Sequence, residues 1–483
     1  MATRSQIIID TRPLWVILLS RSRQTLLLLL GVAIYWWVLE ARTPAGLSVS
    51  GQKALAVFLL CVFYWVFDVL PLMITSLLAI ILIPLSGVMT APQAYALFGN
   101  EAVFFILGAF ILAACFMKSG LSSRIALGIL QRFGTTPRML LVSVLLLNAV
   151  MSFFMSEHAV AAMNFPIIVE ITSVLRLNPR RSRYGKALFL AMAWGSTIGG
   201  VATLLGGGRA PLALGILKEA TGHTFGFVEW SIAILPLVIV LLFVTYVIIV
   251  SFFPIDLASV QAADDVLRDK SMGLGRMRYN ERAIALVMAV TFSAWVIGGE
   301  ELGLANIALG AVVVLFALRL VSWGEVERYV NWGVILMYGG AICLGAAINK
   351  SGAAAWLAQA TITRWATGGT TVVLMVSFLA ILLTEAMSNS AVVALLMPVS
   401  LGIAGEFGMD PRIMALVIAV PAGLATTLPI GTPANAIAYS SGHLSMRDMV
   451  VPGALLGLVS WLVFNAIANW YWPLLGLSIQ GVR

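Results

Sequence analysis

The sequence contains few charged residues and only three cysteines. Of its 483 residues, 10% are charged and 61% are hydrophobic, and the mean hydropathy is +1.01. This composition excludes an ordinary soluble domain, in which about 25% of residues are charged. Cys61, Cys115 and Cys343 each lie within an apolar run, and their spacing suits neither a metal site nor an obvious disulfide. The composition therefore predicts an integral membrane protein in a lipid bilayer, without a structural metal.

Catalytic motifs are also missing from the sequence. His158, His223 and His443 do not have HExxH-like spacing, and no nucleophile lies in a recognised elbow. We therefore expect a protein that is not an enzyme and that needs no organic cofactor. The net charge of +8 comes with basic loops, so it indicates topology and not a nucleic-acid partner.

Long apolar runs predict about eleven transmembrane helices. They lie near residues 24–40, 53–69, 70–89, 102–118, 187–202, 228–253, 282–299, 303–322, 331–349, 411–427 and 450–475. The first run is longer than the apolar region of a signal peptide and lacks a small-x-small cleavage site, so we interpret it as a retained helix.

Lys and Arg collect in the loops at 175–186 and 255–282, on the same side as the basic amino terminus. Because basic loops stay in the cytoplasm, we expect a cytoplasmic amino terminus and an external carboxyl terminus. A bacterial inner membrane is the expected location.

The two halves of the chain contain a repeat. MKSGLSSRIALGIL from Met117 matches NKSGAAAWLAQATI from Asn349, and SEHAVAAMNFP from Ser156 matches SNSAVVALLMP from Ser388, both with an offset of 232. GVATLL from residue 200 matches GLATTL from residue 423 with an offset of 223. The second copy follows five crossings after the first, so it is expected to be inverted. Inverted repeats are typical of secondary transporters, which bind substrate at the repeat interface.

Each half also contains apolar stretches that a simple span does not explain. Those around residues 156–158 and 388–390 predict re-entrant hairpins, and TLLGGGRAP at 203–211 and TLPIGTPAN at 427–435 predict breaks in two further helices. Non-helical backbone at this depth needs protein or a watery cavity beside it. We expect the four interruptions to converge, so that exposed amides and helix amino-terminal ends form an anion site.

The predicted organisation is an all-α polytopic membrane protein with four parts. These are the cytoplasmic amino terminus and first helix at 1–52, repeat 1 at 53–254, a cytoplasmic linker at 255–281 and repeat 2 at 282–483.

The second half resembles the divalent anion/sodium symporter family, which contains dicarboxylate, citrate and sulfate carriers. The resemblance rests on TEAMSNSAVVALLMP at 384–398 and TLPIGTPANAIAYSSGH at 427–443, and it covers nearly the whole chain after the first helix. It implies a homodimer whose transport domain moves against a fixed scaffold. It also implies that a Ser-Asn-Thr motif at each hairpin tip binds the anion, with the neighbouring helix breaks completing two sodium sites.

The family motif can be placed on this sequence residue by residue in the second half. It implies that the substrate is bound by Ser388, Asn389, Ser390, Thr432 and Pro433. It implies cation binding by Thr384, Asn389, Gly431, Pro433 and Asn435.

The first half departs from the family pattern. Ser156, Glu157 and His158 stand where the family has Ser-Asn-Thr, and the first break contains Arg209, which aligns with Thr432. Intramembrane ionisable residues are functional candidates and are expected to have partners. We therefore expect these four first-half residues to bind substrate. In other interpretations, Glu157 and His158 only cap a helix near water, and Arg209 is an interfacial anchor.

These observations predict a secondary-active carrier of small anions of the di- or tricarboxylate or sulfate class, working by an elevator-type mechanism. Glu157, His158 and Arg209 are expected to replace the first sodium site, which makes transport proton-linked or an exchange of anions. The alternative is ordinary sodium-coupled symport. An anion channel is more remote, because closed hairpin tips suit alternating access better than an open pore. Glu101 and Glu385 have no role assigned by this reasoning.

Overall fold

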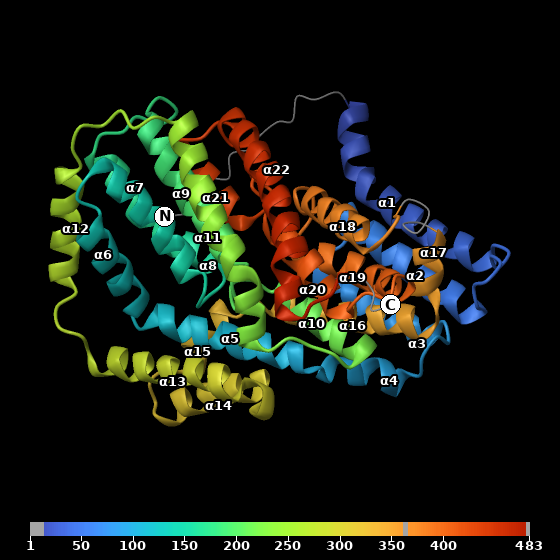
Figure 1. Cartoon of the computed structure of the whole chain (residues 1–483). Helices are drawn as coiled ribbons and strands as arrows, with labels where there is room; N and C mark the ends of the chain where they lie inside the picture. Colours follow the sequence, from blue (N-terminus) through green and yellow to red (C-terminus); the bar gives the residue numbers. More distant parts are fainter. Residues whose placement is uncertain (1–13, 361–365, 480–483) are drawn as a thin grey trace.

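The computed structural model describes residues 14–360 and 366–479, and within these ranges the regular secondary structure is entirely helical (Figure 1). This confirms the predicted all-α class. The first half contains α1 (Leu14–Glu40), α2 (Val49–Val66), α3 (Leu72–Leu85), α4 (Ala91–Ala96), α5 (Glu101–Lys118), α6 (Leu121–Phe133), α7 (Pro137–Met151), α8 (Glu157–Val174), α9 (Arg183–Gly199), α10 (Arg209–Thr221) and α11 (Phe227–Phe252).

After α12 (Gln261–Gly273) the second half follows in the same order. It contains α13 (Tyr279–Leu302), α14 (Leu304–Ala317), α15 (Trp323–Val326), α16 (Trp332–Lys350), α17 (Ala353–Ala360), α18 (Gly369–Thr384), α19 (Asn389–Glu406), α20 (Pro411–Ala419), α21 (Pro433–Ser440) and α22 (Met446–Trp470).

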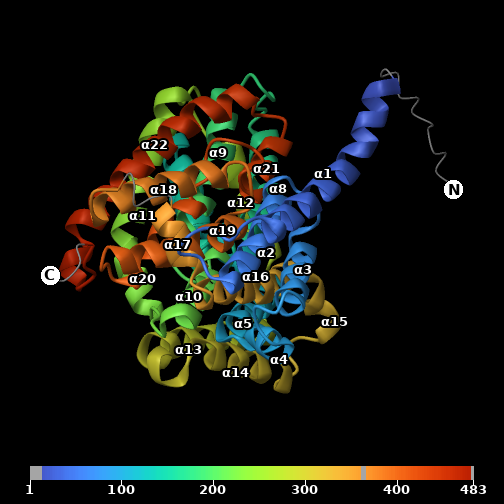
Figure 2. The ribbon, with the colours of Figure 1, turned by 90° about the vertical axis from the view of Figure 1, so that its right-hand side faces the viewer.

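Each of the eleven apolar runs predicted as spans overlaps a helix. In the described part of the chain, eight helices are long and apolar enough to cross a membrane, and five shorter apolar helices accompany them. One of the eight is α19, the second limb of a predicted hairpin. Eleven crossings therefore stay a prediction. Figure 2 shows that the amino-terminal part of α1 stands away from the other helices. Farther along α1, the exposed Leu29, Trp36 and Trp37 suit contact with lipid.

The helix bounds follow the offset found between the sequence motifs. The helices α6 and α17 begin at 121 and 353, α7 and α18 at 137 and 369, and α8 and α19 at 157 and 389, so each pair differs by 232. Both predicted hairpins are thus pairs of helices joined at residues 152–156 and 385–388.

The helices that follow the two breaks start differently. One begins at Arg209 and the other at Pro433. Gly208 before Arg209 has helical dihedral angles and provides no side-chain cap, whereas Thr432 before Pro433 is extended and caps its helix. The alignment of Arg209 with Thr432 stays a prediction. The helices before the breaks end differently, because Pro421 lacks the N–H that would continue α20, and a short 3-10 turn follows.

Two pairs of helices approach very closely. A methyl group on Gly199 of α9 would lie 2.2 Å from the carbonyl oxygen of Ala149 in α7, and one on Gly340 of α16 would lie 2.2 Å from that of Ser76 in α3. Small residues permit such packing between membrane helices. Figure 1 places the pairs in different parts of the molecule, with α7 and α9 beside α8 and α11, and α3 and α16 beside α2.

The predicted linker is partly helical and is held against the first half. Its helix α12 packs on α6 and α8 at the edge of the molecule (Figure 1), and Lys270 of α12 pairs with Glu170 of α8. Arg124 of α6 donates to Glu281 of α13 over 3.0 Å and to the carbonyl oxygens of Leu274 and Gly275.

The predicted topology can be tested with single cysteines at Arg181 and at Gly405, near Gly408. Both positions are exposed, and a side chain at Gly405 meets nothing within 4 Å. The native cysteines are buried, so they give little background. A membrane-impermeant thiol reagent is expected to label position 181 only from the cytoplasm and position 405 only from outside. Labelling of both from one face would contradict the inverted repeat.

Candidate functional site

The two hairpin tips are built in the same way. Ser156 and Ser388 are the N-cap residues of α8 and α19, and their hydroxyl oxygens accept from the backbone amides of Ala159 over 3.4 Å and Ala391 over 3.2 Å. Serine suits this position because its side chain satisfies an amide that the helix leaves free. Glu157 and Asn389 therefore become the first residues of their helices.

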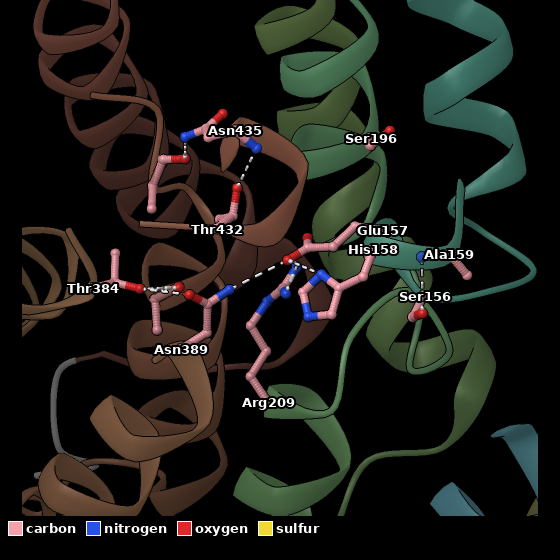
Figure 3. A network of polar contacts seen from close by, with 12 residues as sticks. Ser156, Glu157, His158, Ala159, Ser196, Arg209, Thr384, Asn389, Thr432 and Asn435 are labelled. Carbon is pink, nitrogen blue, oxygen red and sulfur yellow. Dashed lines mark hydrogen bonds and ion pairs between the residues drawn. The ribbon is translucent and has the colours of Figure 1, made fainter. Parts of the chain in front are cut away.

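The first-half tip and the first break meet in a buried ion pair. Arg209 Nη1 donates to Glu157 Oε2 over 3.2 Å, and the side chains are 3% and 0% exposed (Figure 3). This contact gives both Glu157 and Arg209 a partner, as expected for ionisable residues within the membrane. The burial excludes the interpretation of Arg209 as an interfacial anchor with its guanidinium among lipid headgroups. Removing one member of such a pair leaves an uncompensated buried charge.

Asn389 joins the two halves of the site. Its Nδ2 donates to Glu157 Oε1 over 3.3 Å, and its Oδ1 lies 2.8 Å from the hydroxyl of Thr384. That hydroxyl also lies 2.6 Å from the carbonyl oxygen of Ala422 in the second break. Figure 3 shows Glu157, Arg209 and Asn389 converging from separate helices. One carboxylate thus contacts both a first-half cation and a second-half amide.

His158 lies beside the ion pair but is less enclosed. Its Nδ1 is 3.7 Å from Glu157 Oε1, and its side chain is 45% exposed. The structure therefore brings together all three ionisable residues that the sequence singled out in the first half, with His158 on the open side. Ser390 lies near the first break, where a methyl group on Gly208 would be 3.6 Å from its hydroxyl oxygen.

The remaining second-half residues form a separate group in the second break. Thr432 caps α21 by accepting from the Asn435 amide over 3.2 Å, and Asn435 Nδ2 donates to the carbonyl oxygens of Ala425 and Leu428. The Oδ1 of Asn435 is buried and accepts no hydrogen bond from any residue within 14–360 and 366–479. Gly431 forms the turn before them, donating to Leu428 over 3.1 Å.

The exposed Pro433 follows Thr432 as the first residue of α21. A buried neutral oxygen without a donor suits a small hard cation such as sodium, since hard cations are bound by oxygen ligands. No hydrogen bond among the described residues links Asn435 directly to Asn389 or Thr384. The five predicted cation ligands therefore form two groups, which the backbone of the second break connects.

Sequence reasoning missed the role of Glu385. Its carboxylate accepts from the backbone amides of Thr426 and Thr427, each over 2.9 Å, and from that of Leu428 over 2.8 Å. These three amides of the second break are therefore not free for an anion, which corrects the expectation that the interruptions expose them. The sequence did contain a signal for this role: Glu385 is a carboxylate one turn before the second hairpin tip, directly after an apolar helix.

A cavity of about 580 Å³ lies behind α10, outside the tip residues. Glu101, Lys218 and Arg412 line it with the turn between α13 and α14, and Glu101 pairs with Lys218. The pair gives Glu101 a partner away from the tips. Among the described residues, no group of histidine, cysteine or acidic side chains could hold a metal ion.

Comparisons with known proteins agree with this architecture. Residues 22–478 match the family model described as the sodium:sulfate symporter transmembrane region. The sodium-dependent dicarboxylate transporter SdcS of Staphylococcus saprophyticus is 29% identical over 479 residues, covering 94% of this chain and 92% of that protein. The protein of the same name from Staphylococcus aureus is 28% identical over 480 residues, with the same coverage.

Two solved structures share the fold at low sequence identity. The YdaH transporter of Alcanivorax borkumensis has a TM-score of 0.55 and 16% identity, covering 80% of this chain and 88% of that chain. MtrF of Neisseria gonorrhoeae has a TM-score of 0.53 and 12% identity, covering 95% of each chain. The family match over most of the chain confirms the family that the second-half motifs predicted: the protein belongs to the sodium:sulfate symporter family, whose members are transporters and not enzymes.

Proposed function

We propose that the protein is a secondary-active transporter of small anions of the di- or tricarboxylate or sulfate class. The observation that carries this proposal is the buried Glu157–Arg209 pair, which meets Asn389 at the junction of the two hairpin tips. Family membership and the relatives named as sodium-dependent dicarboxylate transporters support the same class of substrate. An open channel is disfavoured, because Glu157 and Arg209 are almost completely buried.

The proposed coupling differs from symport with two sodium ions. A sodium ion held by neutral oxygens would add one positive charge to the first-half site, and the permanently charged Arg209 supplies that charge instead. Ionised Glu157 occupies one edge of the guanidinium and repels an anion. A proton on Glu157 removes the repulsion and weakens the hold on Arg209. We infer that transport is either proton-linked or an exchange of anions.

Any sodium requirement belongs to the second half in this proposal. Thr384 and Asn389 keep a hydroxyl and an amide close together, and Asn435 keeps a buried oxygen without a donor. The rival is ordinary sodium-coupled symport with a first-half cluster that takes no part in coupling. The printed names of the relatives favour that rival.

The resemblance to the family also supports a homodimer in a bacterial inner membrane and an elevator-type movement. Helices α7 to α11 and α18 to α22 would form the moving part, which contains both tips and both breaks. The close pair of α3 and α16 would belong to the fixed part.

Asn389→Ala is expected to abolish nearly all anion uptake while the protein stays folded, because the amide contacts both Glu157 and Thr384. Uptake by purified protein in liposomes measures this effect. Asn469→Ala is the matched control, since it removes an amide that bonds Thr370 and Asn465 away from the tips. Normal uptake by Asn389→Ala would contradict the assignment of the tip.

Imposed sodium and pH gradients distinguish the two forms of coupling. In proteoliposomes, wild-type uptake is expected to rise with external acid or to require internal anion, with at most a shallow dependence on sodium. Glu157→Gln mimics the protonated carboxyl, so it is expected to retain exchange and to lose any response to the pH gradient.

Arg209 variants need a matched control, because Arg209→Ala leaves a buried carboxylate unpaired at a cost of about 3–5 kcal/mol. The double variant Glu157→Gln/Arg209→Gln removes both charges and separates lost charge from lost folding. A steep sodium dependence that Arg209→Ala leaves unchanged would show that the rival is correct.

A further inference from the structure

The guanidinium group of Arg209 has an unused edge. Nη1 donates to Glu157, whereas Nη2 is buried and has no hydrogen-bond partner in the part of the chain that the structure describes. The group lies against bare backbone, since a methyl group on Gly423 would be 2.6 Å from Nη2 and one on Gly207 would be 2.3 Å from Nη1. A buried guanidinium N–H without an acceptor is costly. Nη2 therefore lacks an acceptor among the described residues.

A second buried polar group lies beside Gly208, the residue before Arg209. Tyr338 of α16 is 0% exposed, and its hydroxyl donates no hydrogen bond to the described residues, although the backbone amide of Leu212 lies close to it. A methyl group on Gly208 would be 2.9 Å from this hydroxyl and 3.6 Å from Ser390 Oγ. Gly208 directly precedes Arg209, and the phenol lies within electrostatic range of the guanidinium.

Three groups around Gly208 can donate, whereas the buried Nδ1 of His158 beside Glu157 can donate or accept. Arg209 offers an N–H, and Tyr338 and Ser390 each offer an O–H. Gly208 provides no side-chain cap for α10, so the partial positive charge of this helix start adds to the same region. The acceptor at the site, Glu157, is already engaged by Arg209 and Asn389.

We propose that Tyr338 and the Nη2 edge of Arg209 form a subsite for one anionic oxygen of the transported substrate. This inference rests on the proposed anion-transport function. One carboxylate or sulfate oxygen of the substrate would lie at the first break, and the rest of the substrate would face Asn389 and Ser390.

Tyr338 differs from the other site residues in its position on the fold. It lies on α16, which packs closely on α3 and contains neither a tip nor a break, and its counterpart by the offset of 232 is Ile106. The hydroxyl therefore belongs to the part proposed to stay fixed. It bonds the anion only while the tips lie beside α16, so the affinity for substrate differs between the two ends of the transport cycle.

Tyr338→Phe tests the subsite by removing one oxygen. Binding is measured by thermal shift and by uptake with succinate, citrate and sulfate as probes. For each probe that stabilises the wild type, the variant is expected to bind about ten- to a hundredfold more weakly, as for loss of a hydrogen bond to a charged group. The melting temperature without anion is expected to change little, because the hydroxyl donates no hydrogen bond that the variant would lose.

Tyr184→Phe is the matched control, because the Tyr184 hydroxyl donates to the carbonyl oxygen of Pro137 over 2.7 Å, away from the tips. It is expected to lower the melting temperature without anion and to leave anion affinity unchanged. Gly208→Ala provides a second measurement, because its methyl group crowds the Tyr338 hydroxyl. It should weaken binding more in the wild type than in Tyr338→Phe, which marks the two positions as coupled.

Two outcomes would overturn the subsite, and they differ in what they say of the proposed function. Unchanged anion affinity in Tyr338→Phe, with clear binding by the wild type, would overturn the subsite alone. Absence of binding and uptake by the wild type with every probe would overturn the proposed function together with the subsite.

Discussion

The site depends on one buried carboxylate. Glu157 is fully buried at the start of α8, where the helix amino terminus favours its negative charge. Arg209 lies at the start of α10, where the helix dipole opposes a positive charge. The ion pair therefore stabilises Arg209 more than it stabilises Glu157. Asn389, at the start of α19, donates to the other carboxylate oxygen. The contacts of a single side chain therefore fix the relative positions of three helix starts.

The hairpin tips could be predicted from short sequence motifs, whereas the roles of Glu385 and Tyr338 depend on contacts between distant parts of the chain. The constant offset and the Ser residues located the starts of α8 and α19, and the partner of Glu157 followed from the cost of an unpaired ion in apolar surroundings. Glu385 and Tyr338 contact segments far along the chain, and only the packing of α18 and α16 brings them there.

The two breaks share a backbone plan but carry opposite charges. In the second break, the Glu385 carboxylate accepts hydrogen bonds from three backbone amides. In the first, Phe153 stands at the equivalent position, its carbonyl oxygen accepts from the Thr203 hydroxyl over 2.8 Å, and Arg209 supplies a cation. The second break therefore favours a cation, through its fixed carboxylate and the free oxygen of Asn435. The first favours an anion once Glu157 is neutral or displaced.

The charge at the first break affects how easily the carrier changes conformation when no substrate is bound. Moving an unpaired guanidinium through a closed state would cost several kcal/mol. With Glu157 as a built-in partner, Arg209 keeps a carboxylate when no substrate is bound, and an arriving anion replaces one ion pair with another. An obligate exchanger needs the opposite property, because its empty form must not return. Within the proposed function, the ion pair therefore supports the proton-linked form over exchange: a proton that neutralises Glu157 would free Arg209 for the substrate and would travel with it.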